Sequence, residues 1–354
     1  MKIGYLTHDM DPKAGWGRYA SDLVMGIKKS GHEAVILKER DDGFDGIPVL
    51  KRGAGMFLSA IKVRKYFKDC DIVHAFDVYP YGIIAWLANM FLNKKLMITA
   101  LGTYSVAPLY NPKTRWLSGT AFKSAEAVIA ISNFTRGELL KREELRNVFV
   151  INPGINFQNF HKTRQESSEN FILSVGALKF RKGYHISIPA FALAKKQQPN
   201  LKYKIVGDRK DSNYFASLAK IAKDHGVETS VEFLENIPDE QLNDLYSRAD
   251  VFVLTSVNNS HHFEGYGLVF LEAAAAGLPV IGTRGNGIED AVWDGYNGIL
   301  VSQNNIQGTA DAIISILSDS VRFAKMSQES YEWARWNDLS GVIPKYLDAY
   351  KALL

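Results

Sequence analysis

Short apolar segments rich in β-branched residues alternate along the chain with longer segments whose apolar residues recur at helical spacing. This alternation predicts a parallel β-sheet covered by helices. It runs through the first half, with a helix near 18–29, and starts again at residue 171 after a polar stretch at 161–170. We therefore predict an α/β protein with two facing, doubly wound, Rossmann-like domains (residues 1–160 and 161 onward). The predicted strands are 3–7, 34–38, 72–75, 96–101, 127–131 and 148–151 in the first domain, and 171–175, 203–206, 231–234, 251–254, 280–282 and 298–301 in the second.

The predicted topology also indicates where a ligand would bind. In doubly wound sheets, ligands lie beyond the carboxyl ends of the strands. Two such domains facing each other therefore predict a cleft between them that holds the ligand.

The composition is that of a globular protein, with 46% apolar and 23% charged residues among 354. The single cysteine, Cys70, excludes an internal disulfide framework and fits a reducing compartment. The chain begins with a predicted strand, not with the apolar core of a signal peptide. We therefore expect a cytoplasmic protein.

Positive charge is concentrated in the first domain. Residues 1–160 hold 22 lysines and arginines against 15 aspartates and glutamates, whereas the remainder holds 20 against 23. The basic segment 62–68 follows Phe57, Leu58 and Ile61 and predicts an amphipathic helix. Such a helix can pack on its own sheet, which we favour, or make peripheral contact with an anionic membrane at its inner face. No motif typical of nucleic-acid-binding proteins occurs, so we expect no nucleic-acid partner.

Residues 264–283 carry the pattern most typical of a ligand site. Glu264 and Glu272 are eight residues apart, and the second falls inside an apolar predicted helix. Gly265 and Gly267 allow the backbone to approach a ligand, and the helix start favours a phosphate through its amides and dipole. The alternative is a buried helix with two ordinary solvated glutamates, but a carboxylate close to a core usually has a ligand or partner. The predicted binding residues are Glu264, Gly265, Tyr266, Gly267, Leu268 and Glu272.

Three other glycine-containing loops lie next to predicted strands or helices. One of them delivers Arg181 and Lys182, a planar fork and a mobile point charge that suit a diphosphate; a solvated basic loop is the alternative. Gly207 lies at another strand exit. Gly15 and Gly17 open the first predicted helix, where the backbone could meet a ligand across the cleft.

Two Asp-x-Asp pairs, at 9–11 and 69–71, have the spacing of a metal–diphosphate motif. We interpret them as helix-capping or surface residues, because they lie in the first domain. No histidine or cysteine spacing indicates a zinc site. We expect neither a metal ion nor a cofactor.

The order of these motifs is that of a known family. The chain resembles the retaining glycosyltransferases of the GT-B fold, in the large group called glycosyltransferase family four. Residues 264–272 match its Glu-x7-Glu motif, 250–256 match the preceding strand, and 31–33 match the Gly-His-Glu after its first helix. Further matches, in the expected order along essentially the whole chain, are 71–74, 130–132, 152–155 and 285–289.

The resemblance implies a function and a role for each site residue. A nucleoside-diphosphate sugar would be held mainly by the second domain, and its hexose would pass with retention to a hydroxyl of a glycan, a lipid-linked molecule or a small molecule. Glu272 would bind the ribose hydroxyls and Glu264 the donor sugar. Arg181, Lys182 and the amides around 267–268 would neutralise the leaving diphosphate without a metal.

The resemblance also refines the domain boundaries. Residues 337–354 resemble the terminal helix that returns to the first domain in this fold. The first domain is then discontinuous, with residues 1–160 and 337–354, and the second comprises 161–336.

Four positions depart from the family pattern. Ala177 stands where an arginine is usual, and we hypothesise that Arg181 replaces its charge. Leu101 stands where a histidine close to the donor sugar is common. Gly207 lacks the usual second glycine after it, and Glu235 replaces a frequent glycine. These departures leave open an unusual donor or acceptor, or a catalytically inactive GT-B protein that binds sugar nucleotides.

A different class of enzyme is a further alternative. The segment Gly15-x-Gly17-x-x-Ala20, followed by Glu39 after the next strand, imitates the fingerprint of an NAD-dependent oxidoreductase. However, the first glycine falls about eight residues after the predicted strand ends at Thr7, whereas the true fingerprint turns directly into the helix. We therefore favour the glycosyltransferase.

Overall fold

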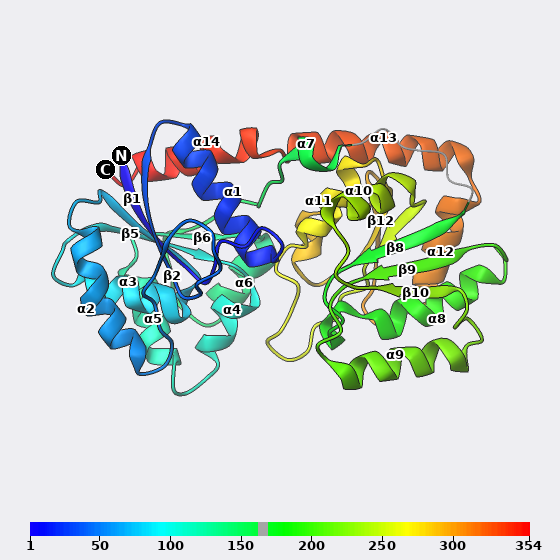
Figure 1. The fold of residues 1–354 in the computed structure, drawn as a ribbon, viewed down its shortest axis with the longest axis horizontal. Helices are drawn as coiled ribbons and strands as arrows, with labels where there is room; N and C mark the ends of the chain where they lie inside the picture. The colour runs from blue at the N-terminus through cyan, green and yellow to red at the C-terminus, as the bar shows by residue number, and fades with distance from the viewer. Residues whose placement is uncertain (162–168) are drawn as a thin grey trace. The chain divides into compact units, whose positions relative to one another are not determined.

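The computed structural model describes residues 1–161 and 169–354 and divides them into two compact units (Figure 1). Unit 1 comprises Met1–Gly154 and Leu339–Leu354, and unit 2 comprises Ile155–Asp338. Most of the polar stretch predicted as a linker, residues 162–168, lies outside the described residues.

The boundaries differ from the predicted ones at 160 and 336. The segment 155–160 belongs to unit 2, because the N–H of Ile155 donates to the carbonyl of Asn337 (3.1 Å) and that of Phe157 to the carboxylate of Asp338 (3.0 Å). The short helix α7 (Phe157–Phe160) then packs against α11 (Leu268–Ala275) of the same unit. The periodicity of the sequence does not reveal these contacts, because their partners are more than a hundred residues apart.

Unit 1 contains a seven-stranded parallel sheet in the order β3-β2-β1-β4-β5-β6-β7. Each predicted strand is present, and the interior strands are almost entirely buried, as expected for a sheet covered on both faces. The two-residue edge strand β3 is not predicted from the sequence, because two exposed residues give no apolar run. The strands are β1 (Lys2–Thr7), β2 (Glu33–Lys38), β3 (Ile47–Pro48), β4 (Ile72–Phe76), β5 (Lys95–Ala100), β6 (Ala127–Ala130) and β7 (Val148–Val150).

The helices of unit 1 cover both faces of this sheet. On one side, α1 packs against the C-terminal helix α14; on the other, α2 packs against α3 and α3 against α5 (Figure 1). Short helical turns occupy Val78–Gly82 and Ala107–Leu109. The α-helices are α1 (Gly15–Lys29), α2 (Gly55–Phe67), α3 (Ile83–Asn89), α4 (Thr103–Val106), α5 (Arg115–Ser124), α6 (Asn133–Leu140) and α14 (Leu339–Lys351).

The helix α14 belongs to unit 1 because its buried side chains complete that unit's core. The hydroxyl of Tyr346 lies 2.5 Å from that of Tyr19, and the hydroxyl of Tyr350 lies 2.7 Å from Nδ1 of His74. Burial lowers the pKa of His74 to about 3, so its ring is neutral at physiological pH. Gly26 lets α1 approach, since a Cβ there would lie 2.4 Å from Cδ1 of Ile343.

Unit 2 contains a six-stranded parallel sheet in the order β10-β9-β8-β11-β12-β13. The prediction of two parallel, doubly wound sheets is therefore confirmed. In both units the strand order reverses beside the first strand, between β1 and β4 and between β8 and β11, which is where such sheets bind ligands. The strands are β8 (Phe171–Val175), β9 (Lys202–Val206), β10 (Val231–Leu234), β11 (Val251–Val253), β12 (Val280–Thr283) and β13 (Gly298–Val301).

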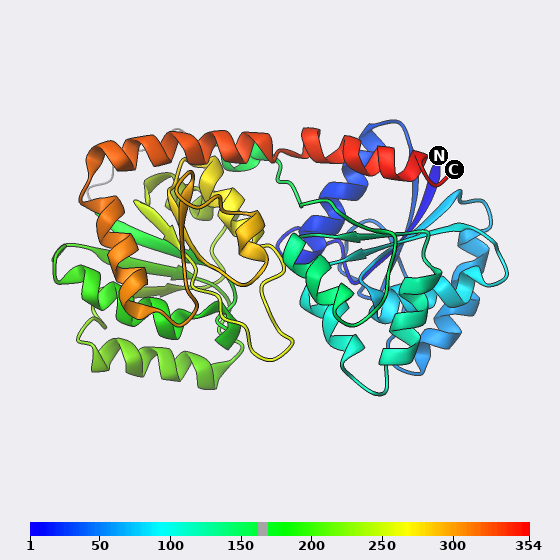
Figure 2. The same ribbon diagram turned by 180° about the vertical axis from the view of Figure 1, so that it is seen from behind.

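The helices of unit 2 again form two layers. Helix α8 packs against both α9 and α12, whereas α11 packs against α13 (Figure 2). Helix α11 ends at Ala275, just before Gly277, whose φ of +75° favours glycine. The remaining helices are α8 (Tyr184–Lys195), α9 (Ser212–Asp224), α10 (Asp239–Arg248), α12 (Ile306–Leu317), α13 (Ser320–Trp336) and the turns at Phe180–Lys182 and Gly287–Asp290.

Candidate functional site

Two loops at the carboxyl edge of the unit 2 sheet bring the predicted charged residues together. One follows β8 and the other follows β11, and these strands are neighbours in the sheet. The Thr255 hydroxyl donates to the carbonyl of Gly183 (2.8 Å), and the N–H of Val257 donates to the carbonyl of Arg181 (2.8 Å). Gly183 is required at this contact, because a Cβ there would lie 1.8 Å from the carbonyl oxygen of Thr255.

The two loops form a cluster of three charges. Oε2 of Glu264 accepts from Nη1 of Arg181 (2.7 Å) and from Nζ of Lys182 (2.6 Å). Glu264 is 8% exposed and Lys182 is 9% exposed. Together these three side chains carry one net positive charge, so the cluster favours an anion although it contains a carboxylate.

The pKa values show how strongly the cluster holds its charges. Burial alone would raise the pKa of Glu264, but the charges of Arg181 and Lys182 outweigh it and lower that pKa to about 2. Burial lowers the pKa of Lys182, and the Glu264 carboxylate opposes that effect. Glu264 is therefore an anion at neutral pH, which suits hydrogen bonds to hydroxyl groups of a ligand.

Glycines shape the backbone between Glu264 and α11. Gly267 has a φ of +88°, in the left-handed region, and, as the N-cap residue of the helix that follows, it has no side chain with which to cap the first turn. Gly265 has its carbonyl oxygen against Gly287, where a Cβ would lie 1.9 Å away. The turn at Leu268 thus begins with amide groups that a ligand phosphate can bind.

Tyr266 and Glu272 point into the protein. Tyr266 is 2% exposed, and its buried hydroxyl has no hydrogen-bond partner within the described part of the chain. Glu272 is also 2% exposed, and its Oε2 accepts from the hydroxyl of Tyr246 on α10 (3.0 Å). The expectation that this carboxylate has a ligand or a partner is met here by a protein partner, and its role toward ribose stays a prediction.

Gly207 has a packing role that the sequence does not indicate. A Cβ at this position would lie 2.0 Å from the carbonyl oxygen of Gly176. The exits of β8 and β9 can therefore lie in contact only because Gly207 has no side chain. Ala177 lies in this contact region and is partly exposed, and Arg181 remains the candidate to supply the charge that an arginine there would carry.

The predicted glycines of unit 1 differ from each other. A Cβ at Gly15 would meet nothing within 4 Å, whereas at Gly17 it would lie 2.2 Å from Oδ1 of Asp9 and 2.3 Å from the carbonyl oxygen of Asp11. Gly17 is therefore required by the loop that precedes α1. Asp9 is 2% exposed, so interpreting it as a surface residue is wrong: the loop folds back on the helix and buries it.

The other Asp-x-Asp pair has local contacts. The carboxylate of Asp71 accepts from the N–H of Lys2 (2.8 Å), next to the start of β1. Cys70 is buried, and its thiol donates to the carbonyl of Tyr66 (3.4 Å). These contacts give the pair a structural role at the amino end of the sheet.

Sequence reasoning missed a polar and aromatic group at the carboxyl edge of the unit 1 sheet. The carboxylate of Glu39 accepts from Nε of Arg52 (2.8 Å), and Nδ1 of His8 lies 3.1 Å from it. The Tyr81 hydroxyl also donates to this carboxylate, and the ring of Trp16 lies edge-on to that of Tyr81. Glu39 was considered only as part of the oxidoreductase fingerprint. The signal for the group as a whole was position, because His8 and Glu39 each directly follow a strand.

Asp77 was missed as well. It follows β4 with a φ of +76°, is fully buried, and accepts from the N–H of Leu101 (3.0 Å) and from the hydroxyl of Ser105. Burial raises its pKa to about 7. Asp77 thus fixes the loop after β5, at the position where Leu101 departs from the pattern described above.

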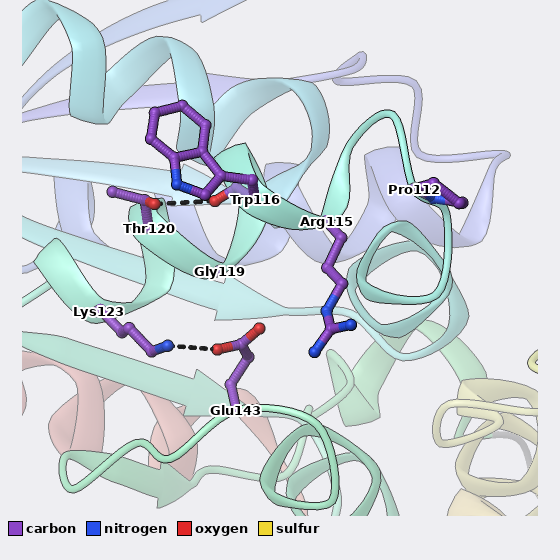
Figure 3. A pocket seen from close by; sticks show the side chains of 7 residues that line it. All are labelled: Pro112, Arg115, Trp116, Gly119, Thr120, Lys123 and Glu143. Carbon is purple, nitrogen blue, oxygen red and sulfur yellow. Dashed lines mark hydrogen bonds and ion pairs between the residues drawn. The ribbon is translucent and has the colours of Figure 1, made fainter.

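The structure also contains a pocket of about 370 Å³ in unit 1 that includes none of the predicted site residues (Figure 3). Nζ of Lys123 lies 2.7 Å from the buried carboxylate of Glu143, and Gly119 leaves room for that carboxylate. Arg115 and the exposed Trp116 lie on the same helix, α5. The lining residues are Pro112, Arg115, Trp116, Gly119, Thr120, Lys123 and Glu143.

Two doubly wound units, each with its strand-order reversal beside the first strand, define the class of GT-B proteins. The solved structure of Anabaena Alr3699/HepE in complex with UDP shares this fold, with a TM-score of 0.83, 20% identity, and coverage of 99% of this chain and 100% of that one. The chain belongs to the family described as glycosyl transferases group 1, whose model matches residues 156–333, and the model of glycosyltransferase family 4 matches residues 14–159. The protein is therefore a glycosyltransferase, as the sequence predicts.

Curated relatives agree with this assignment. The GDP-mannose-dependent alpha-(1-6)-phosphatidylinositol monomannoside mannosyltransferase of Mycolicibacterium smegmatis is 32% identical, over 93% of this chain and 92% of the relative. A glycogen synthase of Mycobacterium tuberculosis is 25% identical, over 86% of this chain and 83% of the relative.

Proposed function

We propose that the protein transfers a hexose from a nucleoside-diphosphate sugar to a hydroxyl acceptor, with retention of the anomeric configuration and without a metal ion. The observation that carries the proposal is the cluster of Arg181, Lys182 and Glu264, in which Lys182 and Glu264 are buried. It provides two cations for a diphosphate and one carboxylate for sugar hydroxyls within a single site.

The cations serve the step in which the sugar leaves the diphosphate. Negative charge grows on the leaving phosphate as the glycosidic bond lengthens, and cations already in place stabilise it without reorganisation. Arg181 offers a planar fork and Lys182 a point charge, and both are held by Glu264 before the donor binds. The amides at the start of α11 add partial positive charge.

The carboxylates serve the sugar hydroxyls. Glu264, ionised at neutral pH, accepts hydrogen bonds from the hexose, and Glu272 accepts them from the ribose after its hydrogen bond with Tyr246 rearranges. The donor can lie close to the backbone at the strand ends, because three glycines there have no side chains: Gly207, Gly265 and Gly267. Tyr266 packs beneath this surface and positions it.

The donor base and the acceptor are not fixed by the relatives. The mannosyltransferase named above depends on GDP-mannose, whereas Alr3699/HepE was solved with UDP. The two curated relatives are named for different products, since one is a phosphatidylinositol monomannoside mannosyltransferase and the other a glycogen synthase. A glycan, a lipid-linked molecule and a small molecule therefore all stay within the proposal. We place the protein in the cytoplasm with peripheral contact at the inner face of the membrane. Within the described residues, no helix has both the length and the apolar character to cross a bilayer.

The first test is thermal unfolding with UDP, GDP, ADP, NAD and NADH. A ligand at about a hundred times its dissociation constant adds roughly 2.7 kcal/mol to the free energy of unfolding. We expect one nucleoside diphosphate to raise Tm selectively. Stabilisation by NAD or NADH alone would instead support the oxidoreductase, and a bound donor that is never turned over would support an inactive sugar-nucleotide-binding protein.

The second test targets the diphosphate contact. We expect the double variant Arg181→Ala/Lys182→Ala to bind the stabilising nucleoside diphosphate at least about tenfold more weakly, because charge-assisted hydrogen bonds are worth about 1.5–3 kcal/mol. Lys179→Ala, an exposed cation of the same loop, is the matched control and should bind normally. Equal affinities in calorimetry would remove the phosphate role, and an inverted product seen by NMR would overturn retention.

A further inference from the structure

One face of unit 1 exposes an unusual number of large apolar side chains. Helices α2, α3 and α5 lie side by side on this face, and we call their outer surface the α2–α5 face (Figure 1). Isolated apolar residues on a surface are ordinary, but a cluster on adjacent helices marks an interaction site. The exposed residues and their exposed fractions are Phe57 (49%), Leu58 (61%), Ile61 (62%), Met90 (61%), Phe91 (72%) and Trp116 (72%).

Helix α2 carries three of these side chains outside the stripe by which it packs on its own unit. Its buried side chains are Met56, Ser59, Ala60, Val63 and Phe67, which recur at helical spacing and form one stripe toward the protein interior. Phe57, Leu58 and Ile61 lie outside that stripe. The packing of α2 on its own unit, which the sequence analysis favoured, therefore leaves a second apolar surface unused.

The part of the sequence that contains this face is rich in positive charge. Residues 51–124 hold eleven lysines and arginines against three aspartates, of which Asp77 is buried. Lys62, Lys65 and Lys68 on or next to α2 are exposed, and none of them forms an ion pair within the described part of the chain. The charge is therefore available to an anionic partner.

Local contacts order the aromatic residues of the face. The guanidinium carbon of Arg64 lies 4.2 Å from the centre of the Phe91 ring, and the rings of Trp86 and Trp116 lie 6.4 Å apart, edge to face. Beside Trp116, the pocket in Figure 3 adds Arg115, with Lys123 already paired to Glu143. Aromatic rings next to cations are typical of surfaces that enter the interface of a bilayer.

We propose that the α2–α5 face docks on an anionic lipid surface. Its apolar side chains would enter the boundary between headgroups and acyl chains, and its lysines and arginines would lie against anionic headgroups. Charge complementarity selects this partner, because the exposed Lys62, Lys65 and Lys68 lie on or next to the helix that exposes three of the apolar side chains, and residues 51–124 contain three acidic residues. Only the purpose of this docking rests on the proposed function: it would hold the acceptor-side unit at a surface where lipid-linked hydroxyl groups occur.

Cosedimentation with vesicles tests the proposal on the whole chain. We expect binding to vesicles of phosphatidylcholine with phosphatidylglycerol and much weaker binding to phosphatidylcholine alone. The triple variant Phe57→Ser/Leu58→Ser/Ile61→Ser should bind at least about tenfold more weakly, because each substitution removes the favourable free energy of transferring an apolar side chain from water into the bilayer interface. Its matched control replaces three exposed apolar residues outside the face: Met25→Ser/Phe149→Ser/Val321→Ser.

A charge-reversal pair separates electrostatic from apolar attraction. Lys62→Glu/Lys65→Glu/Lys68→Glu should lose at least about tenfold in affinity, since each cation near an anionic surface contributes about 1 kcal/mol. The control with the same net charge is Lys196→Glu/Lys210→Glu/Lys223→Glu, three exposed lysines of unit 2.

Several outcomes would overturn the proposal. They are no vesicle binding, equal binding to both vesicle types, or equal losses in the face and control variants. Sedimentation that shows a dimer lost in the Phe57/Leu58/Ile61 variant would assign the face to a second copy of the chain. All variants should keep the Tm shift caused by the nucleoside diphosphate, so failure of docking is distinguishable from failure of the proposed function.

Discussion

We assign Glu264 two roles that compete for the same carboxylate: compensation of the neighbouring cations and, in the proposed complex, hydrogen bonding to the sugar. In the free protein its carboxylate compensates two cations, one of which is almost completely buried. In the proposed donor complex the diphosphate takes over that compensation, and the carboxylate becomes available to sugar hydroxyls. Under this proposal, a single residue stabilises the free site and also takes part in binding.

The variant Glu264→Gln separates these roles. Without the carboxylate, Arg181 and Lys182 repel each other, so the free energy of unfolding without ligand should fall by about 3 kcal/mol. Affinity for the nucleoside diphosphate should rise, because the anion no longer competes with a carboxylate, while sugar transfer should slow. Urea unfolding, calorimetry and a transfer assay measure the three quantities. Glu240→Gln, an exposed glutamate of α10, is the control, and wild-type transfer by Glu264→Gln would exclude the sugar contact.

Asp77 predicts a pH dependence of stability. Its pKa is about 7 in the folded protein and near 3.8 in an unfolded chain, so the folded state binds the extra proton between these values. Stability from this group is fully present below the unfolded pKa and is lost as the pH rises through about 7. Asp77→Asn keeps the shape without titrating. The free energy of unfolding of Asp77→Asn, relative to that of the wild type, should therefore increase by up to a few kcal/mol between about pH 4 and about pH 7.

Denaturant titrations of both proteins across this range measure the difference. Asp41→Asn, an exposed aspartate of the same unit, should show no such trend. A constant difference between wild type and Asp77→Asn would mean that the carboxyl does not change its protonation there.

At the scale of elements, the start of α1 distinguishes a ligand glycine from a packing glycine. Gly17→Ala places a methyl group against the backbone of the preceding loop and should lower the free energy of unfolding by about 1–3 kcal/mol or more. Gly15→Ala meets open space and should leave the protein as stable or up to about 1 kcal/mol more stable. If a ligand approaches the backbone here, Gly15→Ala will nevertheless lower transfer activity. Normal activity in a stable Gly15→Ala would remove that residue from the binding site.

The helices, strands and loops also show which parts of the fold and of the site could be predicted from the sequence. All predicted strands are present in the structure. They could be predicted because buried parallel strands appear in the sequence as continuous apolar segments. Arg181, Lys182 and Glu264 could be assigned to one site by motif, but not paired, because more than eighty residues separate them. The group around Glu39 escaped prediction because Arg52, Tyr81 and His8 come from separate segments without a motif. The sequence predicts Gly17 and Gly207 as ligand-binding positions, whereas the structure shows that each lies against the backbone of another segment.

At the scale of the whole molecule, the stability of unit 1 depends on a helix from the far end of the chain. Removal of residues 339–354 would expose His74, Tyr5 and Tyr19, which α14 covers. We expect the truncated protein to lose protection of unit 1 in limited proteolysis. Unit 2 should stay folded and keep its Tm shift with the nucleoside diphosphate. A truncated chain as resistant as the wild type would show that α14 is dispensable.

The discontinuity of unit 1 has a consequence for synthesis on the ribosome. The segment Met1–Gly154 emerges first but lacks the helix that completes its core, whereas Ile155–Asp338 emerges later and is complete by itself. Unit 2 is therefore synthesised after most of unit 1 but can complete its folding earlier. Until residues 339–354 leave the exit tunnel, the segment Met1–Gly154 has the side chains of Tyr5, Tyr19 and His74 uncovered, and we expect chaperones to engage this segment rather than Ile155–Asp338.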